Sequence, residues 1–224
     1  MDAITLLAEL LGEDRVHTHP LDLLIYAKDA GVDPGSPMAV VLPETTYEVA
    51  EVMRIAHDTG MPVVARGAGT GLAGGAKAND GALLVVLTRM NDLVDVDEVG
   101  LTAWVGPGMV NLELSRLLAD RGLHFAPDPA SQQSSTVGGN LGTNAGGPHC
   151  LAEGSTVAHV LGVEAVTFDG EILTIGGAEP DPIGLDLRGV LVGSEGTLAV
   201  VTKILVKLTE NPPDVVTMLI AFDN

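Results

Sequence analysis

The sequence predicts an α+β protein with an aliphatic core, and three observations support this fold class. Residues 37–92 follow a strand, helix, strand, loop, strand order, which is typical of a small α/β layer. Residues 93–210 are dominated by apolar runs and alternating patterns that indicate strands. Hydrophobic residues make up 46% of the chain but aromatic residues only 3%, so the core must consist of Val, Leu, Ile and Ala.

The composition argues against several kinds of partner. A formal net charge of −19 disfavours nucleic acids and anionic membranes, which both attract basic surfaces. The single cysteine, Cys150, rules out an internal disulfide. No apolar run approaches the roughly 18 residues needed to span a membrane, and the acidic N-terminus is unlike a signal peptide. We therefore expect a cytoplasmic protein with no integral membrane segment.

The first 36 residues are predicted to form an N-terminal helical arm. Apolar residues recur at helical spacing within residues 3–11, and Gly12 ends the pattern. Residues 13–36 are predicted to be irregular. His17 and His19 are metal ligands by type, but no further ligand lies nearby at a suitable spacing, so we assign no metal site.

The α/β layer at residues 37–92 has clear boundaries. Apolar runs predict three strands, at residues 39–42, 62–65 and 82–88. After the first strand, Thr45 and Glu48 form a capping box, in which the threonine accepts from the Glu48 amide and the glutamate reaches back. The helix that follows is expected to end at Gly60.

Beyond residue 92 the pattern predicts mainly strands. These are expected at residues 93–97, 101–105, 160–168, 171–175, 198–207 and 215–222. Helices are expected at residues 111–121 and 186–191. Asp169-Gly170 is a typical two-residue hairpin turn.

A glycine-rich stretch, RGAGTGLAGG at residues 66–75, directly follows a predicted strand. Glycines allow backbone amides to converge, because no Cβ prevents positive φ values or close approach. Such a concave set of amides suits an anion, typically phosphate. Arg66 would add a positive charge at its edge. The alternative is a flexible surface loop.

Residues 69–74 formally match the GxGxxG pattern of a Rossmann nucleotide site. That site requires a helix that starts within the glycines and places its N-terminus at the pyrophosphate. Residues 75–81 are too broken for such a helix, and the next predicted element is a strand. We therefore reject the Rossmann interpretation, and the loop must bind its anion with backbone amides.

A second glycine-rich stretch covers residues 126–148 and is predicted to be a long loop without an amphipathic face. It is rich in Ser, Thr, Asn and Gly, which suits close contact with a large polar ligand, although a linker is the alternative. A third motif, GSEGTLAVVT at residues 193–202, is a tight turn that leads into a strand. Glu195 has either a structural role in this turn or a role in orienting the ligand or the second loop.

Together, these motifs resemble the vanillyl-alcohol oxidase (PCMH-type FAD-binding) superfamily, and most closely its glycolate oxidase/D-lactate dehydrogenase branch. The runs RGAGTGLAGG, PDPASQQSSTVGGNLGTNAGGP and VGSEGTLAVVT appear in the family's order, and the resemblance covers roughly residues 37–210. It implies two α/β subdomains with FAD between them. It also implies a substrate (cap) domain, which is absent from this chain.

The resemblance assigns cofactor-binding residues to all three motifs. The loop that holds the FAD pyrophosphate would comprise Arg66, Gly67, Ala68, Gly69, Thr70, Gly71 and Leu72. The flavin and ribityl side would be lined by Asp128, Ser131, Thr136, Gly138, Gly139, Asn140, Thr143 and Asn144. Glu195, Gly196 and Val200 would either lie near the adenosine end or close the pocket.

The resemblance also predicts that FAD is bound non-covalently. Thr70 stands where some relatives carry the histidine that attaches FAD. Cys150 and His149 follow the second stretch, and a cysteine link occurs elsewhere in the superfamily, but the local sequence is similar to the non-covalent branch. His149 is instead expected to contribute to loop packing.

The resemblance therefore implies the FAD-binding domain of an oxidoreductase, whose complete enzyme oxidises a 2-hydroxy acid and passes electrons to an external acceptor. The expected parts are residues 1–36, the arm; 37–92 and 93–210, the two subdomains; and 211–224, the start of a missing cap domain. A partner subunit or a C-terminal cap domain is expected to complete the enzyme. Alternatives are an inactive FAD-binding subunit or remnant, and a reductase similar to UDP-N-acetylmuramate dehydrogenase. No catalytic residue is assigned.

Overall fold

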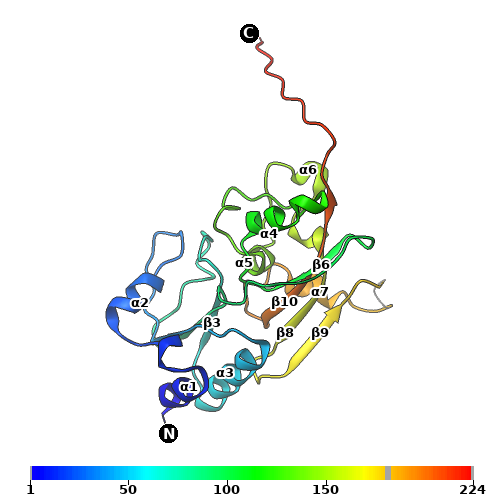
Figure 1. The fold of residues 1–224 in the computed structure, drawn as a ribbon. Coiled ribbons are helices and arrows are strands. Elements are labelled where there is room, and N and C mark those ends of the chain that lie inside the picture. The colour runs from blue at the N-terminus through cyan, green and yellow to red at the C-terminus, as the bar shows by residue number, and fades with distance from the viewer. Residues whose placement is uncertain (1, 180–182, 223–224) are drawn as a thin grey trace.

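The computed structural model describes residues 2–179 and 183–222 and contains two main sheets (Figure 1). The first sheet has the strand order β1 (Val16–His17), β2 (Ala39–Val41), β4 (Leu83–Val86), β3 (Val63–Arg66). Strands β2, β4 and β3 are parallel, and β1 pairs antiparallel with β2. The predicted α/β layer is therefore confirmed, but β1 adds a strand from the N-terminal arm to its sheet.

Helices α1 (Ala3–Leu11) and α3 (Thr46–Thr59) lie against each other beside this sheet (Figure 1). The predicted cap of α3 is present, because the Thr45 Oγ1 accepts a hydrogen bond from the Glu48 amide at 3.1 Å. Glu48 reaches back to the Glu44 amide at 2.6 Å. Gly60 ends the helix in the left-handed region with φ 67°. Local signals are therefore sufficient to predict this helix.

Helix α2 (Pro20–Tyr26) contradicts the prediction that residues 13–36 are irregular. It begins with a proline at its first turn, where the missing N–H costs nothing. A ring nitrogen of His19 accepts from the Leu21 amide at 3.3 Å. Histidine is an unusual cap, so the sequence pattern did not reveal this helix.

The second sheet is antiparallel throughout. Its order is β5 (Leu93–Asp97), β6 (Thr102–Val105), β10 (Val200–Lys207), β8 (Val160–Val166), β9 (Ile172–Gly176). Its helices are α4 (Asn111–Leu117), α5 (Val137–Thr143), α6 (Cys150–Glu153) and α7 (Leu187–Leu191). A small separate sheet pairs β7 (Leu123–His124) with β11 (Thr209–Glu210). Short 3₁₀ turns occupy Glu13–Arg15, Ala119–Arg121 and Thr156–His159.

Three aliphatic cores lie beside the two sheets, and the smallest contains Val40, Leu84 and Val86 of the first sheet with Leu23 of α2 packed against it. The core under α1 and α3 contains residues of the first sheet but also Val166 and Val200 from the second. The remaining core is formed by the second sheet with α4, α5 and α7. The domain boundaries at 1–36, 37–92, 93–210 and 211–224 stay predictions.

The prediction of a strand at residues 215–222 is wrong for this structure. These residues form no strand, and their large apolar side chains, such as Leu219, are exposed. In Figure 1 the segment runs away from the rest of the chain. A strand requires a hydrogen-bonded neighbour, and no part of the described chain provides one.

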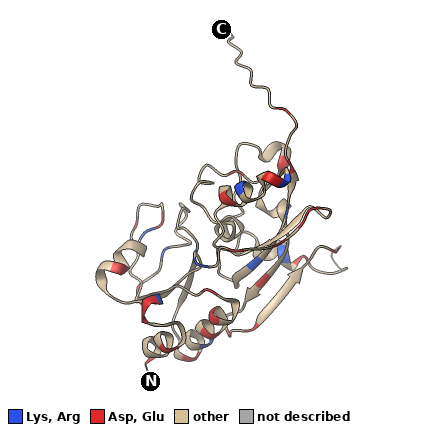
Figure 2. Cartoon of the chain, in the orientation of Figure 1, with Lys and Arg blue, Asp and Glu red and all other residues tan. Residues whose placement is uncertain are grey.

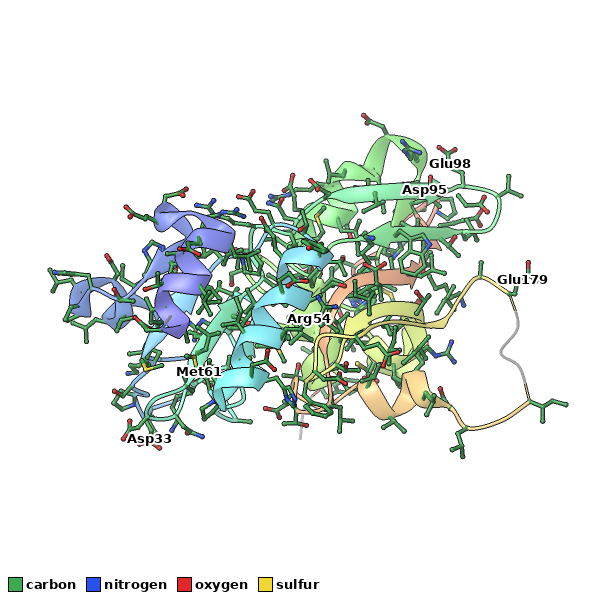
Figure 3. All side chains as sticks on the ribbon, turned by 90° about the horizontal axis from the view of Figure 1, so that it is seen from below. Asp33, Arg54, Met61, Asp95, Glu98 and Glu179 are labelled. Carbon is green, nitrogen blue, oxygen red and sulfur yellow. The ribbon has the colours of Figure 1, made fainter. Side chains whose placement is uncertain are left out.

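Acidic residues outnumber basic ones by 30 to 11, and Figure 2 shows where they lie along the chain. Among the described Asp, Glu, Lys and Arg residues, only Asp29 and Arg66 are buried. Asp95 on β5 and Glu98 in the β5–β6 turn, for example, project outward in Figure 3. Among the described residues, no helix is long and apolar enough to cross a membrane.

Glu164 on β8 connects the two halves of the structure. Its Oε1 accepts a hydrogen bond from the Thr46 hydroxyl in α3 at 2.5 Å and lies 3.0 Å from the Lys203 Nζ of β10. Burial alone would raise the pKa of this carboxyl, but the bonds from Thr46 and Lys203 outweigh burial, so the pKa is lowered.

Replacing Glu164 by glutamine is expected to lower the free energy of unfolding by about 1 kcal/mol at neutral pH. The folded pKa is depressed, so the carboxylate's contribution is present above the unfolded pKa and is lost as the pH falls through the folded pKa. Urea unfolding at neutral pH and well below the ordinary glutamate pKa of 4.5 measures this loss. The exposed Glu171, replaced in the same way, serves as the control. An equal deficit of E164Q at both pH values would contradict the prediction.

Candidate functional site

A cavity of about 420 Å³ lies where the three predicted motifs meet. Fifteen of the eighteen residues predicted to bind the cofactor line it. They are Arg66, Gly67, Ala68, Gly69, Thr70, Gly71, Leu72, Ser131, Thr136, Gly138, Gly139, Asn140, Thr143, Glu195 and Gly196. The structure therefore brings together residues that are up to 130 positions apart in the sequence.

The first glycine loop supplies a row of unpaired amides. It leaves the end of β3, and none of the backbone amides from Gly67 to Ala76 donates a hydrogen bond to another described residue. Unpaired amides in a loop form a concave site for an anion. A polar ligand with phosphate oxygens fits this loop, because it would supply the acceptors that the protein does not.

Arg66 differs from the expectation that its charge lies at the edge of the loop. Its side chain is buried, and its two terminal nitrogens donate to the backbone carbonyls of Ala76 at 3.0 Å and Lys28 at 2.8 Å. Burial lowers the pKa of Arg66, whereas the nearby charge of Asp29 opposes that shift. The guanidinium therefore lies inside the loop and fixes its two ends.

Helix α5 corrects the prediction that residues 126–148 form a long loop. The chain is helical over Val137–Thr143, and Val137, Asn140 and Leu141 share a buried face. The Thr136 Oγ1 caps the helix by accepting from the Gly139 amide at 3.1 Å. Three glycines in seven residues hide this short helix in the sequence, because glycine disfavours helices.

The glycines of α5 allow the neighbouring segments to approach closely. A Cβ at Gly138 would lie 2.6 Å from the Cβ of Pro107. A Cβ on Gly67 would collide with the Thr136 hydroxyl, so the first loop lies directly against the cap of α5. These contacts close one side of the cavity.

Asn140 presents an unsatisfied polar group at the cavity. Its side chain is buried, and its Nδ2 has no hydrogen-bond partner among the described residues. A buried donor without a partner is costly unless a ligand or water completes it. This orphaned donor, together with the unpaired loop amides, fits a ligand that is rich in acceptors.

The third motif forms a turn that contacts both the first loop and α5. Glu195 has φ 51° and Gly196 has φ 75°, and the Glu195 amide donates to the Gly142 carbonyl at 2.8 Å. A positive φ at a non-glycine residue is uncommon and is often found at functional sites. The Glu195 side chain lies against Gly75 of the first loop, where a Cβ would collide with its carboxylate.

Three predicted residues do not line the cavity. Asp128 accepts from the His149 ring nitrogen at 2.6 Å. Asn144 ends α5 with φ 47°, and its Oδ1 accepts from the Val157 amide at 3.0 Å. Val200 is buried in the core beneath α3 and borders a second cavity of about 320 Å³. Their roles toward a cofactor stay predictions.

Sequence reasoning missed much of the apolar lining, which comes from strand ends and adjacent turns. Added by the structure are Ala65, Ala73, Gly75, Ala76, Leu87, Pro107, Leu141, Gly142, Ala145, Ser194, Ala199 and Val201. Small size at a strand end was the only available signal. Among the described residues that line the cavity, Arg66 and Glu195 are the only ones with ionisable side chains.

Residues 37–176, more than half of the chain, match the family model described as an FAD binding domain. The chain belongs to this family. FAD is therefore its cofactor, as the resemblance implied. Among the described residues, no group of three or more His, Cys, Asp or Glu side chains is placed to hold a metal ion.

Named relatives place the FAD-binding domain in the expected branch. It is 44% identical over 188 residues to the glycolate oxidase subunit GlcD of Escherichia coli K12, covering 84% of this chain and 38% of that protein. It is 37% identical over 209 residues to D-2-hydroxyglutarate dehydrogenase of Xanthomonas citri pv. viticola, covering 92% and 44%. The chain thus spans less than half the length of these relatives.

The PCMH-type fold is also confirmed. The FAD-binding domain matches the structure of p-cresol methylhydroxylase with a TM-score of 0.82 at 22% identity, over 95% of this chain and 44% of that one. The partial coverage fits the expectation that the cap domain is not part of these 224 residues.

Proposed function

We propose that the FAD-binding domain serves an enzyme that oxidises a 2-hydroxy acid to the 2-oxo acid. The observation that carries this proposal is its similarity to two relatives named for glycolate and for D-2-hydroxyglutarate, both of which are 2-hydroxy acids. When bound, FAD supplies the hydride acceptor at flavin N5. The residues of this chain hold and orient it.

In this proposal each motif has a separate task. The amides of residues 67–76 hold the pyrophosphate, and Arg66 shapes their loop. Asn140 and its neighbours on α5 satisfy polar edges of the flavin and ribityl chain. Glu195 and Gly196 close the adenosine end. Asp128, Asn144 and Val200 are proposed to support these segments from outside the cavity.

We further propose that FAD is bound non-covalently. Thr70 lines the cavity, and it lacks the imidazole nitrogen of the histidine that attaches FAD in some relatives. Cys150 is not a cavity-lining residue, and its Sγ accepts from the Gly147 amide at 3.0 Å. Denaturing the purified protein in acid should therefore release all of the flavin.

The substrate, the electron acceptor and a partner subunit or cap domain belong to the complete enzyme. A relative's name includes the word subunit, which supports a partner chain. The cytoplasmic location also stays a proposal, and fractionation of cells that express the intact protein would test it.

The test of this function uses the intact protein with its cofactor. We expect flavin absorption bands in the purified protein and their bleaching by D-lactate, glycolate or D-2-hydroxyglutarate under anaerobic conditions. L-Lactate and a 3-hydroxy acid are the controls for specificity. A protein that shows no flavin absorption bands after incubation with FAD and removal of the unbound flavin would contradict FAD as the cofactor. A yellow protein that none of these acids reduces would contradict the oxidation and favour an inactive FAD-binding subunit.

A further inference from the structure

The segment between α2 and β2 makes direct contact with the glycine loop at residues 66–75. Besides the bond from Arg66 to the Lys28 carbonyl, the Ala30 amide donates to the Gly71 carbonyl at 3.0 Å. The C=O and N–H of a trans peptide unit point in opposite directions. Because the Gly71 carbonyl faces the arm, the Leu72 amide faces away from it, among the residues that line the cavity.

Arg66 is the centre of this arrangement. Its guanidinium bonds to the carbonyl of Ala76 at the far end of the loop, and Gly69 covers its face so closely that a Cβ there would collide with it. The side chain is 7% exposed. A cation that is covered by its own loop is poorly placed to meet a phosphate.

Asp29 is the buried counter-charge in the arm. It is only 8% exposed, its Oδ1 accepts from the Gly31 amide at 2.8 Å, and its Oδ2 has no hydrogen-bond partner among the described residues. A buried carboxylate is tolerated when an opposite charge compensates it. Arg66, whose guanidinium donates to the carbonyl of the adjacent residue Lys28 at 2.8 Å, supplies such a charge, although no direct ion pair joins the two side chains.

We propose that Asp29 is a positioning residue of the FAD site. Its charge keeps the guanidinium of Arg66 inside the loop, and Arg66 keeps the loop in the conformation that turns its amides to the cavity. The inference rests on FAD binding by this domain, and it adds the arm segment at residues 28–31 to the site. In this arrangement Arg66 acts from within the loop and contacts no phosphate.

The test compares Asp29→Asn with Asp33→Asn in the intact protein. Asparagine keeps the size of the side chain and the acceptor for Gly31 but removes the charge. Asp33 lies at the outer edge of the same arm and is exposed (Figure 3), so it controls for the loss of one negative charge. Binding of FAD and of riboflavin, which lacks phosphates, is measured by flavin fluorescence at low and high ionic strength.

We expect D29N to weaken FAD binding about tenfold, because the guanidinium of Arg66 loses its compensating charge and the loop amides lose their orientation. Riboflavin binding should not change, whereas general destabilisation would weaken both ligands. D33N should bind both ligands like the unchanged protein. An FAD affinity of D29N equal to that of D33N would overturn the inference, as would an equal loss for both flavins.

Arg66→Gln extends the test by a double-mutant cycle with D29N. If Asp29 acts through Arg66, the double variant should bind FAD no more weakly than R66Q alone. Salt screens a direct ion pair between Arg66 and a phosphate but does not screen an effect on the loop conformation. If Arg66 acts only on the conformation, salt should weaken FAD binding equally in the unchanged protein and in R66Q. Additive losses, or a salt dependence that disappears in R66Q, would overturn the inference. Oxidation of 2-hydroxy acids is assayed separately. If the protein oxidises none of these acids, the FAD-binding measurements still test the role of Asp29.

Discussion

The variant Gly69→Val is expected to lose FAD binding, with a dissociation constant raised about 100-fold or more by roughly 3 kcal/mol of strain. Gly69 has φ 72°, where a β-branched residue is strongly disfavoured. A Cβ there would also collide with the guanidinium of Arg66, which is held by the Lys28 and Ala76 carbonyls and cannot retreat without breaking those bonds. The loop must therefore move, and the amide cradle is lost. Titration of the apoprotein with FAD measures the effect.

Gly122→Val is the matched control. Gly122 has φ 69°, but nothing lies within 4 Å of a Cβ at that position. This variant has similar backbone strain without the collision, and its residue is not part of the cavity lining. We expect it to lose some stability but to bind FAD normally. If G69V bound FAD like G122V, the loop would be a flexible surface segment and not a cradle.

Gly67→Ala is expected to weaken FAD binding about tenfold and to lower the free energy of unfolding by about 1 kcal/mol, the value of a helix cap. The methyl group would collide with the Thr136 hydroxyl that caps α5, and it would lie 3.6 Å from the Gly139 Cα. Since φ at Gly67 is not positive, alanine fits the backbone and the effect comes from the contact alone. Thermal unfolding and FAD titration measure both losses.

The control for the contact between position 67 and α5 is a variant that lacks the Thr136 hydroxyl. Thr136→Ala opens space for the methyl group, so G67A should add little to the cost of T136A. Gly177→Ala, where nothing lies within 4 Å of the added Cβ, should leave stability and FAD binding unchanged. Independent, additive losses in G67A and T136A would show that the first loop and α5 do not depend on each other.

Elements with local signals were predictable from the sequence. The capping box at Thr45 and Glu48 and the stop at Gly60 define α3 without any reference to the rest of the fold. By contrast, α2 begins at an unusual histidine cap, and α5 contains too many glycines for its buried face to be recognised. Their stability comes from tertiary contacts, which a local pattern does not contain.

In the candidate site, too, features with a local sequence signal were predictable and features set by tertiary contacts were not. Motifs identified the two glycine-rich stretches and the turn at Glu195, and the cavity contains most of their residues. The position of the Arg66 charge was predicted wrongly, because its acceptors lie 38 residues before it and 10 residues after it. Nothing near Asp29 in the sequence indicates that it interacts electrostatically with this arginine. Such pairings are set by the fold.

The core beneath α3 has a consequence for the order in which the chain can fold during synthesis. That core is completed by Val166 and Val200, which enter it from β8 and β10. A nascent chain that ends before these residues leaves apolar surface of α3 and the first sheet uncovered, and contacts across such distances form slowly. The α/β layer is therefore expected to consolidate only when β10 has left the ribosome, although all of its own strands precede residue 92.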